Sequence, residues 1–252
     1  MQMNLTPELL ALLDSEDAGL RASAAKAIGL TGNASALPAL LDHLRDSDAL
    51  AGDAVAAAIG RLGNRSAVPR LAAALTADDE ATRARAAFAL GALKASETVP
   101  QLGRMLLADR PMAARRAAEA LAAIGTTEAL TALAAPLADA DTTSARHLAM
   151  IGLEMAGPLA VPTLVAGLNR DQATLRTNSA EMLGWLKAAP ATAELAQALS
   201  DADPNVRSQA AWALREVATP EARAALMKAL SVETDAAAQH TAALALTHAK
   251  TQ

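Results

Sequence analysis

Residues 201–215 read DADPNVRSQAAWALR, and residues 78–91 read DDEATRARAAFALG. Both stretches place an acidic turn before an arginine, which small and apolar residues then follow at helical spacing. In the first stretch the spacing runs through Arg207, Ala210, Ala211 and Leu214, positions that share one face of a helix. The pattern predicts a helix with a narrow, alanine-rich face that packs closely against its neighbours.

The two stretches belong to a repeat of 31 residues that runs along the whole chain. Leucine fills two columns and alanine a third in eight successive repeats, without an insertion. A fixed period of this length is the signature of stacked helical units. The three columns are Leu9, Leu40, Leu71, Leu102, Leu133, Leu164, Leu195 and Leu226; Leu13, Leu44, Leu75, Leu106, Leu137, Leu168, Leu199 and Leu230; and Ala25, Ala56, Ala87, Ala118, Ala149, Ala180, Ala211 and Ala242.

Each repeat is expected to hold two helices. Proline recurs where the first helix should begin, which suits a residue without a backbone N–H. An aspartate column precedes the second helix and is placed to cap it, and glycine follows that helix in several repeats. Repeat 5 departs from the pattern with Pro136 and Gly157-Pro158, which leaves open a local kink or a hinge. The capping column contains Asp17, Asp48, Asp79, Asp141 and Asp203.

These features predict an all-α fold, a right-handed α-α superhelix (solenoid) of eight 31-residue helix-pair repeats. Because one helix pair cannot bury its own apolar face, each repeat depends on its neighbours, and a single domain over residues 1–252 is expected. The repeats are expected at about 1–31, 32–62, 63–93, 94–124, 125–155, 156–186, 187–217 and 218–248.

Residues 201–215 and 78–91 resemble HEAT-like repeats of the short class also found in phycobilin lyases, and the resemblance covers essentially the whole chain. It implies a buried polar ladder between repeats, made by the turn aspartate and an arginine early in the second helix. The pairs that match are Asp17 with Arg21, Asp79 with Arg83, and Asp203 with Arg207; the positions that depart are Gly52, Ala114, Ala145 and Ala238.

Composition narrows the function classes. Phe88, Trp185 and Trp212 are the only aromatic residues, so leucine, alanine and other aliphatic residues must build the core. The net charge of −5 argues against nucleic-acid binding by the molecule as a whole. The absence of cysteine excludes disulfides and thiolate metal sites. With no basic leader and no apolar run expected to span a bilayer, a cytoplasmic protein without membrane contact is predicted.

No motif for catalysis, cofactor binding or metal binding is recognised. The histidines are His43, His147, His240 and His248, and their spacing does not suit a shared metal. The chain also lacks the glycine-rich phosphate loops and the nucleophile elbow of common enzyme classes. No catalytic residue, cofactor or metal ligand is therefore expected, and the protein is predicted not to be an enzyme.

The candidate binding surface lies on the second helices. Residues 61–116 carry ten Lys/Arg and five Asp/Glu, a local charge of +5, so the rest of the chain carries −10. The tryptophans fall in a more acidic region, and Trp185 should lie near Trp212 in the next repeat. Each of these residues also has a non-binding interpretation: the aromatic residues could pack against neighbouring helices, and the arginines could simply be exposed to solvent. The predicted partner-binding residues are Arg85, Phe88, Arg115, Arg116, Glu119, Arg146, His147, Met150, Asn178, Glu181, Trp185, Gln209, Trp212 and Glu216.

The sequence thus favours a protein–protein interaction scaffold that binds a protein or peptide along the concave surface formed by the second helices. Under the hypothesis that the arginines contact the partner, that partner is acidic. One alternative is a nucleic-acid-binding solenoid that uses Arg85, Arg115, Arg116 and Arg146, as HEAT-like DNA glycosylases use a basic groove. The other is a lyase-like or chaperone-type accessory protein. The partner and the oligomeric state are not determined at this level.

Overall fold

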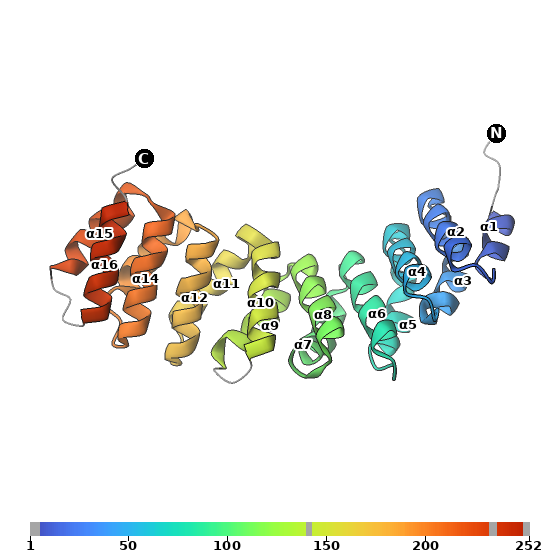
Figure 1. The fold of residues 1–252 in the computed structure, drawn as a ribbon, viewed down its shortest axis with the longest axis horizontal. Coiled ribbons are helices and arrows are strands. Elements are labelled where there is room, and N and C mark those ends of the chain that lie inside the picture. The colour runs from blue at the N-terminus through green and yellow to red at the C-terminus, as the bar shows by residue number, and fades with distance from the viewer. Residues whose placement is uncertain (1–5, 140–142, 232–235, 249–252) are drawn as a thin grey trace. The chain divides into compact units, whose positions relative to one another are not determined.

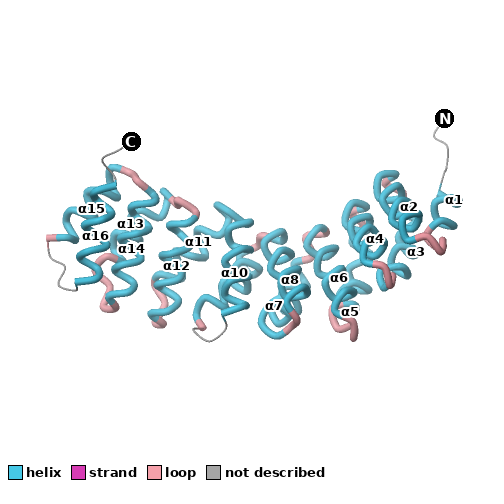
Figure 2. The backbone as a smooth tube through the Cα atoms, viewed as in Figure 1, coloured by secondary structure: helices cyan, strands magenta, loops and turns pink. Residues whose placement is uncertain are grey.

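The computed structural model describes residues 6–139, 143–231 and 236–248 (Figure 1). Within these ranges the chain forms α-helices, 3-10 turns and short loops, and no strand occurs there (Figure 2). The predicted all-α repeat fold is confirmed. The chain divides into two compact units, unit 1 over Met1–Leu133 and unit 2 over Ala134–Gln252, which are described separately below.

Unit 1 contains four complete helix pairs. In each pair the first helix is short and the second has 13 or 14 residues. The second helices pack in chain order, α2 against α4, α4 against α6, and α6 against α8. The helices are α1 Thr6–Leu12, α2 Ala18–Thr31, α3 Leu37–Asp42, α4 Ala49–Leu62, α5 Val68–Ala74, α6 Glu80–Ala92, α7 Val99–Ala108 and α8 Pro111–Ile124; α9, Thr127–Ala134, ends at the boundary between the units.

Unit 2 continues the repeat after a 3-10 turn at Ala135–Ala138. Its second helices also pack in chain order, α10 against α12, α12 against α14, and α14 against α16. The helices are α10 Thr143–Ala156, α11 Val161–Leu168, α12 Ala173–Trp185, α13 Thr192–Ala198, α14 Pro204–Val217, α15 Pro220–Leu230 and α16 Ala236–His248.

The core is built from the leucine and alanine columns. All eight alanines of the third column are buried, from Ala25 to Ala242. Small residues bring neighbouring second helices into close contact: a Cβ added at Gly29 would lie 2.9 Å from Ala58 Cα, and one at Gly91 would lie 2.7 Å from Ala120 Cα. Because the backbones approach so closely, the core has little room for aromatic side chains.

The ends of the helices follow the predicted signals. Asp17, Asp48, Asp79 and Asp203 each accept a backbone N–H in the first turn of a second helix. The fifth predicted cap, Asp141, lies outside the described residues. Helices α8 and α14 begin at proline, as expected. Helices α2, α4 and α8 end at glycines with φ between +63° and +69°, which L-residues with a Cβ rarely adopt. The local capping chemistry was therefore readable from the sequence.

In repeat 5 the first helix ends before Pro136. Pro136 does not lie inside an α-helix, because α9 ends at Ala134 and Pro136 is buried in the 3-10 turn that follows. Proline has no N–H for the α-helical ladder, and its ring crowds the preceding turn, so the α-helix stops before it. The second helix, α10, ends at Ala156, and Gly157 then adopts a φ of +57°.

Candidate partner-binding surface

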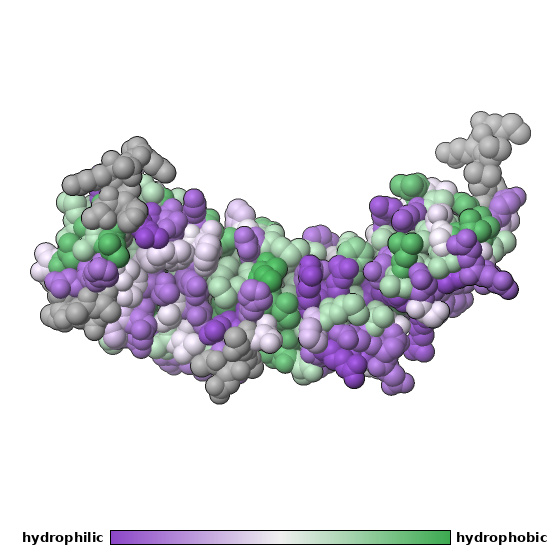
Figure 3. Space-filling model, viewed as in Figure 1, coloured by the Kyte–Doolittle hydropathy of each residue, from purple (hydrophilic) through white to green (hydrophobic). Residues whose placement is uncertain are grey.

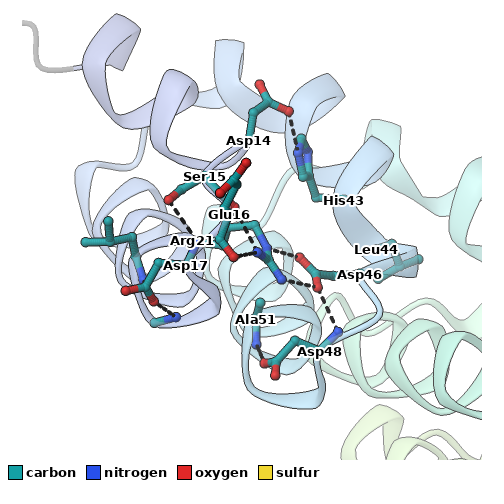
Figure 4. Close-up of polar contacts among 12 residues, drawn as sticks. Asp14, Ser15, Glu16, Asp17, Arg21, His43, Leu44, Asp46, Asp48 and Ala51 are labelled. Atoms are coloured by element: carbon teal, nitrogen blue, oxygen red, sulfur yellow. Dashed lines mark hydrogen bonds and ion pairs between the residues drawn. The ribbon is translucent and has the colours of Figure 1, made fainter.

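Arginines near the start of the second helices connect neighbouring repeats within each unit. Arg21 donates from Nε and Nη2 to the two carboxylate oxygens of Asp46, at 2.6 and 2.9 Å, and from Nη1 to the carbonyls of Ser15 and Glu16 (Figure 4). A bidentate pair with additional backbone contacts fixes both position and orientation. The same arrangement joins Arg83 to Asp109 and Arg176 to Asp201.

The expected ladder between neighbouring repeats is present, but the carboxylates that bind Arg21 and Arg83 are not those of Asp17 and Asp79. These aspartates cap the second helix of their own repeat, so their carboxylates are engaged by backbone N–H groups. The carboxylate that binds the arginine comes from the turn of the following repeat. Arg176 makes the same kind of contact although Gln172 occupies its capping position, a case that the expected pairing missed.

The ladder shifts the acidity of its carboxyl groups. The hydrogen bonds from Arg21 hold the pKa of Asp46 below its usual value, and those from Arg83 do the same for Asp109, although burial opposes the shift at both positions. At Asp201, burial is the largest influence and would raise the pKa, but the bonds from Arg176 and the N–H of Asp203 lower it overall. The ladder is therefore ionised at neutral pH.

Arg85 is not a surface residue, which corrects its assignment to the partner-binding set. Its side chain is 4% exposed. Nη1 donates to the carbonyls of Leu44 and Asp46 at 3.2 and 2.7 Å, and Nη2 donates to the carbonyl of Asp48 at 3.1 Å. Its Nε donates to Asp53 at 3.2 Å. Arg85 thus satisfies backbone acceptors in the turn of the preceding repeat, and its donors are engaged there.

Gly52 explains why Arg85 turns inward. Gly52 occupies the column of Arg21, and a Cβ there would overlap the guanidinium of Arg85. In repeats that carry the column arginine, that side chain binds the turn carbonyls of its own repeat. Where glycine replaces it, Arg85 enters from the next repeat and binds the carbonyl of Asp46 instead.

Asn178, which lies in the column of Arg85, is also not a surface residue. It is 8% exposed, and its Nδ2 donates to the carbonyl of Leu137 at 2.7 Å. Leu137 occupies the same column as Leu44, whose carbonyl accepts from Arg85. An amide and a guanidinium therefore meet equivalent backbone acceptors in the two units. The expectation that Asn178 is exposed on the surface is wrong for the same physical reason.

A pocket of about 230 Å³ opens on the second helices of unit 1. Its floor is formed largely by alanines of α4 and α6, and the exposed side chains Phe88 and Met112 stand beside it. Asp53 and Arg116 supply charge at the lining. Met112 and Asp53 were not predicted. The available signal for Met112 was its column in the repeat, where Leu50 and Met112 are large and apolar while the other members are small or polar.

Two arginines near this pocket share one glutamate, so one of their two positive charges is balanced. Arg116 lies 5.1 Å from the centroid of the Phe88 ring and donates to Glu119 at 2.8 Å. Arg115 donates to the other oxygen of Glu119 at 2.9 Å. With Arg85 buried, unit 1 offers less free positive charge than the sequence indicated. Arg146, the fourth member of the predicted basic patch, belongs to unit 2.

Two tryptophans meet on the second helices of unit 2, as predicted. The rings of Trp185 on α12 and Trp212 on α14 have centroids 5.5 Å apart and are tilted by 60°. Trp185 is 61% exposed, whereas Trp212 is half-buried. The ring of Trp212 rests over Gly184, where a Cβ would overlap its six-membered ring. Gly184 thus holds one indole on the surface, and that indole supports the other.

The remaining predicted residues of unit 2 lie at or near the surface. His147 is exposed, and the others are half-buried. Glu216 accepts from Arg215 at 2.7 Å, so its charge is partly balanced. Their role in binding stays a prediction. The half-buried set is Arg146, Met150, Glu181, Gln209 and Glu216.

The described residues contain no group of three or more metal-binding side chains. His43 is used structurally, because Nδ1 contacts the carbonyl of Ala39 at 2.8 Å and Nε2 contacts Asp14 at 3.1 Å (Figure 4).

One stretch of unit 2, Ser144–Leu168, is long and apolar enough to cross a membrane by length and composition alone. The expectation that no run would reach this length was therefore wrong. The stretch comprises α10 and α11 with a 3-10 turn between them, and Leu153, Leu164 and Leu168 are buried in the packing of the repeats. Core helices pass the same composition test, so the finding is weak evidence for a membrane span.

Exposed apolar side chains occur in both units. On the face drawn in Figure 3, apolar and polar residues are interspersed. The large apolar residues that are exposed include Leu30, Leu50, Met155, Leu159 and Met227 besides those already named. Scattered exposed residues of this kind are normal for folded proteins. The tryptophan pair stands apart because two large rings are in contact with each other.

Comparison with known proteins identifies the family to which the repeats belong. The family model for HEAT repeats matches residues 6–82, 68–154 and 161–247, which together span nearly the whole chain. No curated protein matches the sequence.

Several solved structures are similar. A chain in the structure of the complex of CpcE and CpcF of phycocyanin lyase from a Nostoc species aligns with 24% identity and a TM-score of 0.47, covering 97% of this chain and 94% of that one. Human deoxyhypusine hydroxylase aligns with 22% identity and a TM-score of 0.44, covering 98% and 96%. YibA of Escherichia coli aligns with 20% identity and a TM-score of 0.48, covering 96% and 92%. With three matches of the family model along its length, the chain belongs to the HEAT repeat proteins.

Proposed function

We propose that this HEAT repeat protein is a scaffold that binds a segment of another protein on the second helices, with the main contact in unit 2 at Trp185 and Trp212. The observation that carries the proposal is the exposure of Trp185, 61%, while its ring is in contact with a second indole. Burying an exposed tryptophan removes a large apolar area from water, and tryptophan is enriched among the residues that dominate binding energy.

The position of the pair also supports binding. Trp185 is not needed to fill the core, since the leucine and alanine columns already do so. Its neighbour Trp212 is fixed by Gly184, so the surface loses little conformational freedom when a partner binds. Rigid aromatic side chains with an open face are typical anchors in protein interfaces.

In unit 1 the pocket beside Phe88 and Met112 supports a second contact for an apolar side chain. The nucleic-acid alternative receives less support. Arg85 is buried, and Arg115 and Arg116 share Glu119, which leaves few arginines free for a phosphate backbone. Binding without catalysis, and a cytoplasmic location, stay predictions of the sequence.

Selection of random linear peptides displayed on phage would test the proposal. We expect the wild-type protein to enrich a common motif and Trp185→Ala to bind the selected peptides about tenfold more weakly. Met227→Ala is the matched control, because Met227 is 58% exposed but lies on the first helix α15 of the same unit. Selected peptides that bind Trp185→Ala as well as wild type would contradict the placement of the site.

A further inference from the structure

The surface around the tryptophans has a regular arrangement of aromatic and acidic residues. The 31-residue register places Glu154, Trp185 and Glu216 at equivalent positions on the neighbouring helices α10, α12 and α14. One turn earlier, Glu181 on α12 is equivalent to Trp212 on α14. In this register each indole therefore has a glutamate one turn away on its own helix and another at an equivalent position on a neighbouring second helix.

The charge of this surface is mainly negative. Neither Glu154 nor Glu181 takes part in an ion pair within the part of the chain that the structure describes. Glu216 is paired with Arg215. The cationic residue nearest to Trp185 in the sequence is Lys187, which is exposed and lies just after α12. Two carboxylates thus remain available beside an exposed indole face.

We infer that Trp185, supported by Trp212 and flanked by Glu154 and Glu181, binds an arginine or lysine side chain of the partner segment. The inference rests on the proposed function and specifies the partner as basic at this contact, in contrast to the acidic partner that was one sequence-based hypothesis for the arginine-rich part. A cation over an indole face is attracted by the negative charge of the ring, and nearby carboxylates add to the attraction.

The two tryptophans make the test direct. They are the only tryptophans of the protein and tyrosine is absent, so essentially all intrinsic fluorescence arises at this site. The probe is a blocked tetra-arginine peptide, titrated at low salt and compared with tetra-citrulline, its neutral analogue, and with tetra-glutamate. We expect a saturable fluorescence change with tetra-arginine that weakens as salt is added, and no comparable change with the other two peptides.

Variants separate the contributions. Trp185→Leu keeps an apolar side chain but removes the ring, and should weaken tetra-arginine binding about fivefold, read from the fluorescence of Trp212. Glu154→Gln and Glu181→Gln should each weaken it about threefold. Lys187→Gln should strengthen it about twofold, because it removes a repelling charge.

Glu221→Gln is the control for the glutamate variants, since Glu221 is an exposed glutamate on the first helix α15 and should leave binding unchanged. Equal fluorescence changes with tetra-citrulline or tetra-glutamate would overturn the inference. So would a failure of all three peptides to change the fluorescence, or binding that is insensitive to Glu154→Gln and Glu181→Gln.

The two proposals fail in different ways. Phage-selected peptides that depend on Trp185 but lack arginine and lysine would overturn the basic partner and leave the scaffold function intact. Selection of peptides whose binding does not depend on Trp185 would instead overturn the binding site itself.

Discussion

Gly52 with Arg85 in unit 1 and Gly184 with Trp212 in unit 2 are two versions of one arrangement. In each, a glycine on one second helix makes room for a large side chain from the second helix of the next repeat. The outcomes differ. Arg85 is buried and donates hydrogen bonds to three backbone carbonyls, whereas Trp212 is half-buried and contacts the exposed ring of Trp185.

The difference shows that the position of the glycine along its helix, and the backbone acceptors near it, decide what the incoming side chain does. Gly52 lies at the start of α4, next to turn carbonyls that need a donor, so a guanidinium is drawn inward. Gly184 lies near the end of α12, and its place is taken by a ring that has no such acceptor to reach. One glycine therefore serves stability, and the other shapes a surface.

The largest expected effect is at Arg85. Arg85→Ala leaves the carbonyls of Leu44, Asp46 and Asp48 without their buried donor and should lower the free energy of unfolding by about 2–4 kcal/mol. Arg116→Ala, in the same column of the next repeat, should cost less than about 1 kcal/mol, because Arg116 is partly exposed. Urea unfolding followed by circular dichroism measures both.

The double variant Gly52→Arg/Arg85→Ala should recover much of the loss, since it restores the arginine of the regular column. Equal losses for Arg85→Ala and Arg116→Ala would contradict the contrast between a buried and a surface arginine.

A smaller effect is expected at the other glycine. Gly184→Ala places a methyl group against the ring of Trp212 and 2.9 Å from Ala213 Cα, so the ring or the helix must move. We expect a loss of about 1–3 kcal/mol in the free energy of unfolding, together with a shifted tryptophan emission. Gly103→Ala is the control, because a Cβ there would lie 3.5 Å from Ala132 Cβ, an ordinary contact. Unchanged tryptophan emission would argue against the packing of the Trp212 ring over Gly184.

The smallest expected effect is on the loss of stability at acidic pH. Asp109 has a pKa that is lowered in the folded protein, chiefly by its hydrogen bonds from Arg83. The stability from this pair is therefore fully present above the unfolded pKa, about 3.9, and is lost as the pH falls through the lower folded value. Arg83→Ala should reduce the stability lost between pH 6 and pH 3 by on the order of 1 kcal/mol.

Arg85→Ala should keep most of that pH dependence, because its main partners are carbonyls that do not titrate. Urea unfolding at the two pH values compares the variants. The same pH dependence in Arg83→Ala and in wild type would show that the Arg83–Asp109 pair does not contribute.

Sequence periodicity was enough to predict the helical repeat fold, four aspartate caps and the pairing of Trp185 with Trp212. Each depends on residues close in sequence or, like Trp185 and Trp212, one helical turn short of a full period apart, and the strict register carries such relations without a structure. The ladder was harder to predict. The partner of Arg21 comes from the following turn, and the partner of Arg83 lies one position out of the aspartate column.

What the sequence by itself determined is the all-α repeat, because helical spacing, capping residues and a 31-residue period act locally and recur. Only the tertiary structure decided which side chains are free for a partner. Arg85 and Asn178 occupy a column that Arg116 and His147 share, yet the first two are buried. The physical reason is that a long polar side chain turns toward unsatisfied backbone carbonyls wherever the neighbouring helix leaves space, and that space depends on a residue in another repeat.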